Sequence, residues 1–146
     1  MEKKEMQQTT EKGGIVYNTP WILQRADPYV YRHTDGMYYF TASVPAYDRI
    51  ALRRSETLAG LAQAEEVTVW MKHESGIMSK HIWAPELHYL DGKWYIYFAG
   101  GEAEDIWAIR PYVLECTDAD PLTGTWKELG KMQCADDDEF SFRAFS

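Results

Sequence analysis

Two proline-containing segments place side chains with catalytic or binding chemistry at the expected starts of strands. Asp27 directly precedes Pro28 in "RADPYVYRHTDGMYYFTAS", and Trp83 and Glu86 lie on either side of Pro85 in "HIWAPELHYLDGKWYIYFAG". A carboxylate at position 27 could act as a general base that takes a proton from water. The alternative is that Asp27 caps a turn, because Asp-Pro commonly initiates turns.

The second segment adds an aromatic and a histidine to these carboxylates. Trp83 is interpreted as a stacking platform for a sugar, because C–H faces of sugars pack on flat rings; the alternative is packing between sheets. His81 alternates with Trp83 and is expected to point the same way, as a ligand or as a packing residue. Glu86 is interpreted as a sugar-hydroxyl ligand or auxiliary carboxylate, with a buried structural acid as the alternative.

These residues stand in a repeat that predicts how they are positioned. Asp35-Gly36 and Asp91-Gly92 each lie between two alternating aromatic runs and are typical of β-hairpin turns. The two hairpin units recur at a spacing of about 57 residues, and each precedes two more expected strands. Those further strands are expected at 49–55 and 65–70 in the first unit and at 110–117 and 125–129 in the second.

Four strands per unit predict an all-β fold made of β-propeller blades. Propellers close with about four to eight blades, so two units indicate part of a larger ring. Segment 56–66 is expected to be a loop, because Gly60 interrupts its helical composition. The expected boundaries are a flexible lead-in at 1–17 and a partial propeller at 18–146, with blade one at about 25–75, blade two at about 81–132 and the start of blade three at about 139–146.

At "RADP" and "HIWAPELHYLDGKWYIYF" the sequence resembles glycoside hydrolase family 43, the five-bladed propeller arabinofuranosidases and xylosidases. The resemblance runs from about Asn18 onward, and "YYFTASVPAYDRIALRRS" and "IWAPELH" look most like the α-L-arabinofuranosidases. It covers the N-terminal two-fifths, roughly, of that family's catalytic domain.

The resemblance implies inverting hydrolysis with three carboxylates, of which Asp27 matches the general base. The aspartate that tunes the acid's pKa is expected beyond Ser146, and the glutamic acid that serves as general acid is expected further on. Glu86 does not match that acid. The resemblance implies no required cofactor. A structural calcium ion in the central channel is conceivable by analogy, although no ligand set is visible and the acidic run at 135–140 is interpreted as a solvated turn.

Composition argues against two classes of binding partner, nucleic acids and membranes. The net charge of −8 argues against nucleic acid, and no apolar run is long enough for a transmembrane helix, so no membrane partner is expected. The polar N-terminus lacks the apolar core of a signal peptide, which predicts a cytoplasmic location. Cys116 and Cys134 are expected to be free thiols, with a disulfide as the alternative.

Three functions remain open at this point. The chain is expected to be the N-terminal part of an inverting glycosidase that acts on arabinofuranosyl or xylosyl linkages and is inactive alone. The alternatives are a non-catalytic carbohydrate-binding module and an interaction module that completes its propeller by self-association through an exposed blade face. Segment 100–112 is expected to form a rim loop, in which Trp107 and Arg110 are candidates for setting specificity.

Overall fold

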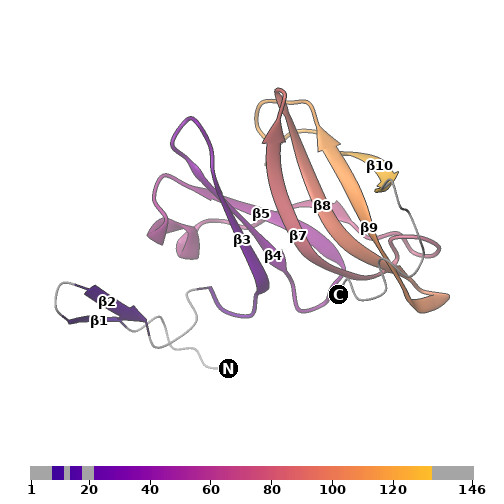
Figure 1. Cartoon of the computed structure of the whole chain (residues 1–146), viewed down its shortest axis with the longest axis horizontal. Coiled ribbons are helices and arrows are strands. Elements are labelled where there is room, and N and C mark those ends of the chain that lie inside the picture. Colours follow the sequence, from indigo (N-terminus) through magenta and orange to yellow (C-terminus); the bar gives the residue numbers. More distant parts are fainter. Residues whose placement is uncertain (1–7, 12–13, 18–21, 133–146) are drawn as a thin grey trace.

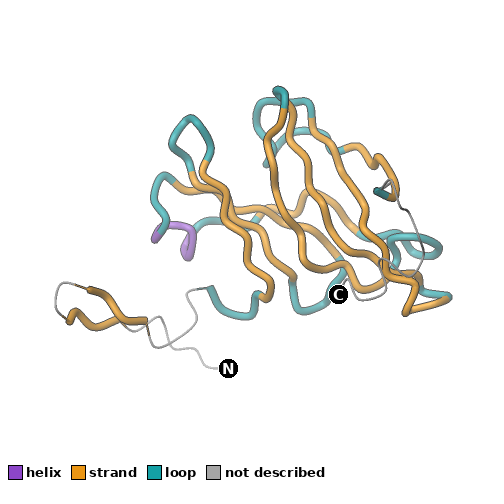
Figure 2. The backbone as a smooth tube through the Cα atoms, viewed as in Figure 1, coloured by secondary structure: helices purple, strands orange, loops and turns teal. Residues whose placement is uncertain are grey.

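The structure, a computed structural model, describes residues 8–11, 14–17 and 22–132, and most of these lie in β-strands (Figures 1 and 2). In chain order the elements are β1 Gln8–Glu11, β2 Gly14–Tyr17, β3 Ala26–Arg32, β4 Tyr38–Ser43, β5 Arg49–Ser55, the short 3-10 helix η1 Ala59–Gln63, β6 Val67–Met71, β7 Lys80–Leu90, β8 Lys93–Glu102, β9 Asp105–Cys116 and β10 Lys127–Lys131. The predicted all-β class is confirmed.

Eight of these strands form two four-stranded antiparallel sheets, ordered β3-β4-β5-β6 and β7-β8-β9-β10. Each strand pairs with its neighbour in the chain, as short connections between antiparallel strands allow. The two sheets lie side by side in Figure 1, and the first strand of the second sheet, β7, contacts β3, β4 and β5 of the first. They are consecutive blades of a β-propeller, called blade one and blade two below.

The Asp-Gly pairs form the two hairpin turns for different backbone reasons. Asp91 and Gly92 have φ angles of +52° and +79°, as a two-residue type I′ turn requires. In the longer first turn only Gly36 has a positive φ, of +90°, and the Asp35 carboxylate accepts the Met37 N–H at 2.8 Å. Both turns join the first and second strands of their blades, as the sequence predicts.

Strand alternation builds one shared core between the blades. Tyr39 on β4 faces blade two, and its ring lies 5.0 Å from that of Trp94 on β8, which is fully buried. The aromatic second-strand residues therefore pack blade against blade. The buried members of this core are Tyr39, Ile50, Leu52, Trp70, Met78, Ile82, Leu87, Trp94, Ile96, Phe98, Tyr112, Leu114 and Cys116.

The opposite face of blade one has its own smaller core beneath η1. Leu61 of η1 is completely buried and packs with Phe40 of β4. The segment expected to be a loop thus contains a single 3-10 turn. A Cβ atom at Gly60 would lie 2.3 Å from the Ser55 hydroxyl oxygen and 2.9 Å from that of Thr57, so a larger residue here would force these side chains to move.

The prediction of a rim loop at 100–112 is wrong. Strand β8 continues to Glu102 and β9 begins at Asp105, so a tight turn joins the two strands and these two residues pair. Gly100 lies inside the ladder, where a Cβ atom would come within 3.3 Å of the Tyr112 ring. Glycine here marks a close approach of side chain to backbone rather than the end of a strand.

The remaining expectations concern the ends of the chain. Within the expected lead-in, β1 and β2 form an antiparallel hairpin that the sequence does not predict, and among the described elements they contact only each other. The expected third-blade start at 139–146 and Cys134 lie outside the described residues, whereas Cys116 is a buried free thiol. In the part of the chain that the structure describes, no helix is long and apolar enough to cross a membrane.

Candidate active site

Asp27 sits on a β-bulge at the start of β3. The register between β3 and β4 shifts between Ala26 and Tyr29, and Asp27 takes a φ of +51°. A non-glycine residue in this left-handed region carries a backbone cost of about 1–2 kcal/mol, which the surrounding structure must offset. The bulge turns the carboxylate out of the ladder and leaves the residue exposed.

Ser43 connects this carboxylate to the second blade. Ser43 ends β4 opposite Ala26, and its side-chain hydroxyl donates to Asp27 Oδ2 at 2.9 Å. The same oxygen, Oγ, accepts the backbone N–H of Ala84 on β7 at 2.8 Å. Ser43 is 2% exposed, so the bridge between Asp27 and Ala84 is shielded from solvent at its centre.

Ala84 lies on a bulge of the same kind in blade two. Its φ is +56°, and the β7–β8 register shifts between Trp83 and Glu86. Asp27 and Ala84 therefore occupy equivalent bulges, each followed by a proline. In blade one the bulge presents a carboxylate, and in blade two it presents a backbone donor that holds this carboxylate through Ser43.

Trp83 and His81 lie together, as expected from their spacing. Their rings stack at 4.7 Å between centroids with an interplanar angle of 12°. Tyr47, which the sequence reasoning missed, meets Trp83 edge-on at 5.2 Å, and its carbonyl oxygen accepts the N–H of Ile82 at 3.0 Å. Among the described residues, the buried Trp83 Nε1 and His81 Nδ1 have no hydrogen-bond partner.

Glu86 does not join these residues. Its side chain is 57% exposed and approaches His88 on the same face of β7, with 3.3 Å between Oε1 and Nε2. Glu86 and His88 line a hollow of about 320 Å³ together with Tyr97 on β8. The alternative of a buried structural acid is therefore wrong, and Glu86 faces away from the core that joins the blades.

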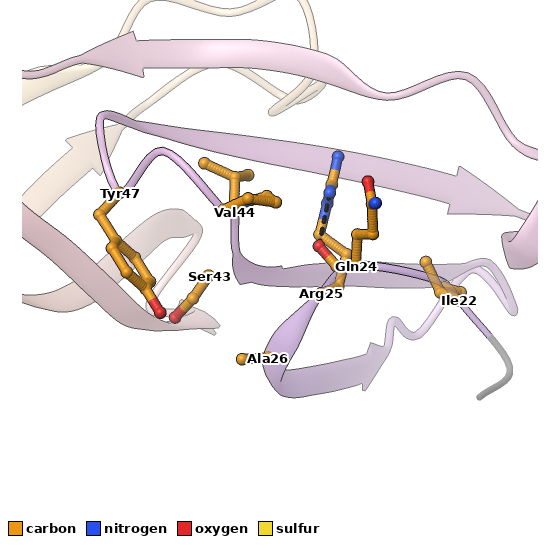
Figure 3. A pocket seen from close by; sticks show the side chains of 8 residues that line it. Ile22, Gln24, Arg25, Ala26, Ser43, Val44 and Tyr47 are labelled. Atoms are coloured by element: carbon orange, nitrogen blue, oxygen red, sulfur yellow. Dashed lines mark hydrogen bonds between the residues drawn. The ribbon is translucent and has the colours of Figure 1, made fainter. Parts of the chain in front are cut away.

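A larger pocket of about 460 Å³ is lined by Ser43, the hydrogen-bond partner of Asp27, and by Ala26, the residue before Asp27 (Figure 3). It is lined by Ile22, Gln24, Arg25, Ala26, Ser43, Val44, Pro45 and Tyr47. Figure 3 shows the hydroxyl groups of Ser43 and Tyr47 pointing toward the same side of it. Ser43, which contacts Asp27, and Tyr47, which contacts Trp83, therefore line the same pocket.

Arg25 in this pocket is held by the carboxylate of Glu66, the residue directly before β6. Its Nε donates to Glu66 Oε2 at 3.0 Å, and a second nitrogen bonds the other carboxylate oxygen. This hydrogen bonding lowers the pKa of Glu66 from its ordinary value of 4.5, with help from Arg53 and against the opposing effect of burial. The pocket wall thus rests on an ionised, paired carboxylate.

The two residues expected on a rim loop have separate positions on β9. Trp107 is 72% exposed, and its ring centroid lies 6.4 Å from that of His81. Arg110 is 7% exposed and donates to the carbonyl oxygen of Ile109, so the expectation that it lines a rim is wrong. Among the described residues no group of three or more His, Cys, Asp or Glu side chains could hold a metal ion.

The chain is thus a pair of propeller blades with a solvent-facing carboxylate beside a cluster of aromatic rings. Comparison with known proteins gives it a family: the glycosyl hydrolases family 43 model matches residues 17–143, so the chain belongs to that family.

Its relatives are longer proteins. It is 59% identical over 118 residues to the extracellular exo-alpha-(1->5)-L-arabinofuranosidase of Streptomyces avermitilis, covering 81% of this chain and 24% of that protein. The enzyme of the same name from Streptomyces chartreusis is 57% identical, covering 82% and 36%. The crystal structure of an alpha-L-arabinofuranosidase from Lactobacillus brevis matches with a TM-score of 0.73 and 52% identity, covering 80% of this chain and 38% of that one.

These comparisons correct the expected location. Both Streptomyces relatives are named extracellular enzymes, which contradicts the cytoplasmic location expected from the polar N-terminus. The chain spans 24% and 36% of the lengths of these two relatives.

Proposed function

We propose that this chain carries the general base, Asp27, of an inverting α-L-arabinofuranosidase. Four curated relatives that are 44% to 59% identical to this chain, and a solved structure at 52% identity, are named arabinofuranosidases, which supports this assignment. The observation that carries the proposal is geometric. Asp27 is the residue that matches the family's base, and its bulge presents the carboxylate to solvent while Ser43 holds one of its oxygens.

The chemistry follows from a carboxylate in this setting. Water attacks the anomeric carbon of an arabinofuranosyl unit, and Asp27 takes the proton that the water loses. The glycosidic C–O bond breaks, and a carboxylic acid on the opposite side gives its proton to the leaving oxygen. This acid and the aspartate that tunes it would come from the rest of a longer protein, and the reaction needs no cofactor.

Trp83 is proposed to hold the sugar beside this base. Its ring stacks on the His81 ring and lies perpendicular to the Tyr47 ring, and these contacts restrict its motion, so it can offer a rigid apolar surface. Trp83 directly precedes Ala84 in the chain, and the backbone N–H of Ala84 donates to Ser43. Glu86 is proposed to contact hydroxyl groups of a bound saccharide from the hollow that it shares with Tyr97.

The chain by itself is proposed to be inactive, because it supplies one of three required carboxylates. Its blade-two face with Tyr95 and Tyr97 corresponds to the blade-one face that blade two covers. We infer that this face makes the isolated chain self-associate, since the equivalent surface of blade one is buried. The longer protein is proposed to act outside the cell, like the enzymes whose names say so.

A substrate panel tests the proposal on the longer enzyme that contains this chain. We expect release of 4-nitrophenol from 4-nitrophenyl α-L-arabinofuranoside at least about 100-fold faster than from the β-D-xylopyranoside, a ratio that sugar-specific contacts readily supply. Proton NMR during hydrolysis should show the β anomer of arabinose first, because inverting enzymes reverse the configuration. A preference for the xyloside removes the substrate assignment, and initial release of the α anomer removes the inverting mechanism.

A further inference from the structure

We infer that Ser43 is a positioning residue for Asp27, and that it makes the orientation of this base depend on the docking of blade two against blade one. The inference rests on the proposed function, in which Asp27 is the base. It uses two hydrogen bonds that meet at a single oxygen atom, Ser43 Oγ.

The direction of both hydrogen bonds follows from the groups that take part. The Ala84 backbone N–H can only donate, so Ser43 Oγ is its acceptor at 2.8 Å. An ionised carboxylate can only accept, so the one hydroxyl proton of Ser43 points to Asp27 Oδ2 at 2.9 Å. The hydroxyl therefore has one arrangement in which both partners are satisfied.

This arrangement leaves the two carboxylate oxygens in different roles. Oδ2 is held by Ser43, whereas Oδ1 receives no hydrogen bond from the residues that the structure describes. Oδ1 is therefore the oxygen that remains available to take a proton from water. Rotation of the carboxylate about its Cβ–Cγ bond by less than a half-turn would break the bond to Ser43, so the serine fixes the plane of the carboxylate and the direction of its second oxygen.

Burial explains why the contact is specific to a hydroxyl side chain. Ser43 is 2% exposed and Ala84 is half-buried, so water has poor access to replace a missing hydroxyl. Without that hydroxyl, the Ala84 N–H, which the bulge removes from the ladder, loses its acceptor. A serine-to-alanine change should then free the carboxylate of Asp27 and the amide of Ala84 together.

Thr41 offers a matched control on the same strand. Thr41 is 1% exposed, and its hydroxyl donates to the carbonyl oxygen of Ala51 at 2.9 Å, inside blade one. Thr41→Ala therefore removes a buried hydroxyl hydrogen bond from β4, as Ser43→Ala does, but leaves the hydrogen bonds to Asp27 and Ala84 in place. Ser43→Thr keeps the hydroxyl and serves as the rescue variant.

The first measurement is steady-state kinetics of the longer enzyme on 4-nitrophenyl α-L-arabinofuranoside. We expect Ser43→Ala to lower kcat about 10- to 100-fold with KM changed less than about threefold, because a misoriented base weakens the transition state more than substrate binding. Thr41→Ala should keep kcat within about twofold of wild type, and Ser43→Thr should recover most of the loss. Unchanged kcat in Ser43→Ala, or an equal loss in Thr41→Ala, overturns the positioning role.

The second measurement does not depend on catalysis. Hydrogen exchange of the Ala84 amide, followed by NMR, should accelerate at least about tenfold in Ser43→Ala and stay unchanged in Thr41→Ala. Equal exchange in Ser43→Ala and wild type overturns the coupling between blades. If the wild-type enzyme releases no arabinose, the proposed function fails, and the coupling is then decided by this exchange measurement alone.

Discussion

Tyr39 and Tyr95 occupy equivalent positions in the two blades, but blade two covers only Tyr39. Tyr39 is 3% exposed and packs on Trp94, whereas Tyr95 lies on the opposite face of β8 from Trp94 and bonds Glu115 through its hydroxyl at 3.1 Å. The repeat therefore presents the same aromatic position twice, once in the core between the blades as Tyr39 and once on the outward face of blade two as Tyr95.

This relationship predicts self-association of the isolated chain through the blade-two face. Sedimentation velocity at increasing concentration should give masses above the 16.9 kDa monomer. Tyr97→Glu, which places a charge beside the Tyr95 ring, should shift the equilibrium toward monomer, while Leu58→Glu on the far side of blade one should not. A monomer at all concentrations, or an equal shift in both variants, contradicts the prediction.

Trp94 should contribute most to the stability of the pair of blades. It is completely buried, and its indole N–H donates to the carbonyl oxygen of Ala119 at 3.1 Å. Trp94→Ala should lower the free energy of unfolding by about 3–5 kcal/mol, measured by urea denaturation, because it leaves a large cavity. Trp107→Ala, which removes a 72% exposed indole, should change it by less than about 0.5 kcal/mol. Similar losses in the two variants would contradict this account of the core.

Glu66 should give the fold part of its acid sensitivity. Its pKa in the folded protein lies below 4.5, chiefly because Arg25 donates to it, so its stabilising effect is present above about pH 4.5 and is lost as the pH falls through the lowered value. Glu66→Gln should cost about 1–2 kcal/mol of unfolding free energy at pH 7 and less at pH 3. Urea denaturation at both pH values measures this, with the exposed neighbour Glu65→Gln as control. A cost for Glu66→Gln that does not change with pH would refute it.

Trp107 should extend the binding surface beyond the sugar that is cleaved. Its exposed ring lies 6.4 Å from His81, next to the stacked pair of His81 and Trp83. In the longer enzyme, Trp107→Ala should raise KM for arabino-oligosaccharides about three- to tenfold and leave KM for the 4-nitrophenyl arabinofuranoside nearly unchanged. Leu129→Ala, another exposed apolar residue, is the control. An equal effect on both substrates would place Trp107 elsewhere in the site.

Much of the fold could be predicted from the sequence because local patterns determine it. Alternating aromatic runs around Asp91-Gly92 predict a two-residue hairpin, and the structure has one with both φ angles positive. The rim-loop prediction failed because segment 100–112 is longer than its counterpart in the first unit, and the extra length extends the β8–β9 ladder instead of forming a loop. Gly100 lies within this ladder because the Tyr112 ring from the next strand approaches it closely, a contact that no local pattern contains.

The site was predicted only in part for a similar reason. The stacking of His81 on Trp83 follows from alternation along a strand. Ser43 was missed because a serine at the end of a strand carries no distinctive signal. Its role depends on a positive φ at Asp27 and on the approach of Ala84 from another blade, and both arise from tertiary structure.

The role of Asp27 is tested most directly by its replacement in the longer enzyme. The kcat values of the wild type and of Asp27→Ala on 4-nitrophenyl α-L-arabinofuranoside should differ by about 100- to 10,000-fold, the usual contribution of a positioned general base. Circular dichroism should show that both proteins are folded, because Asp27 is exposed and outside the core. A folded Asp27→Ala enzyme that retains wild-type kcat would contradict the account.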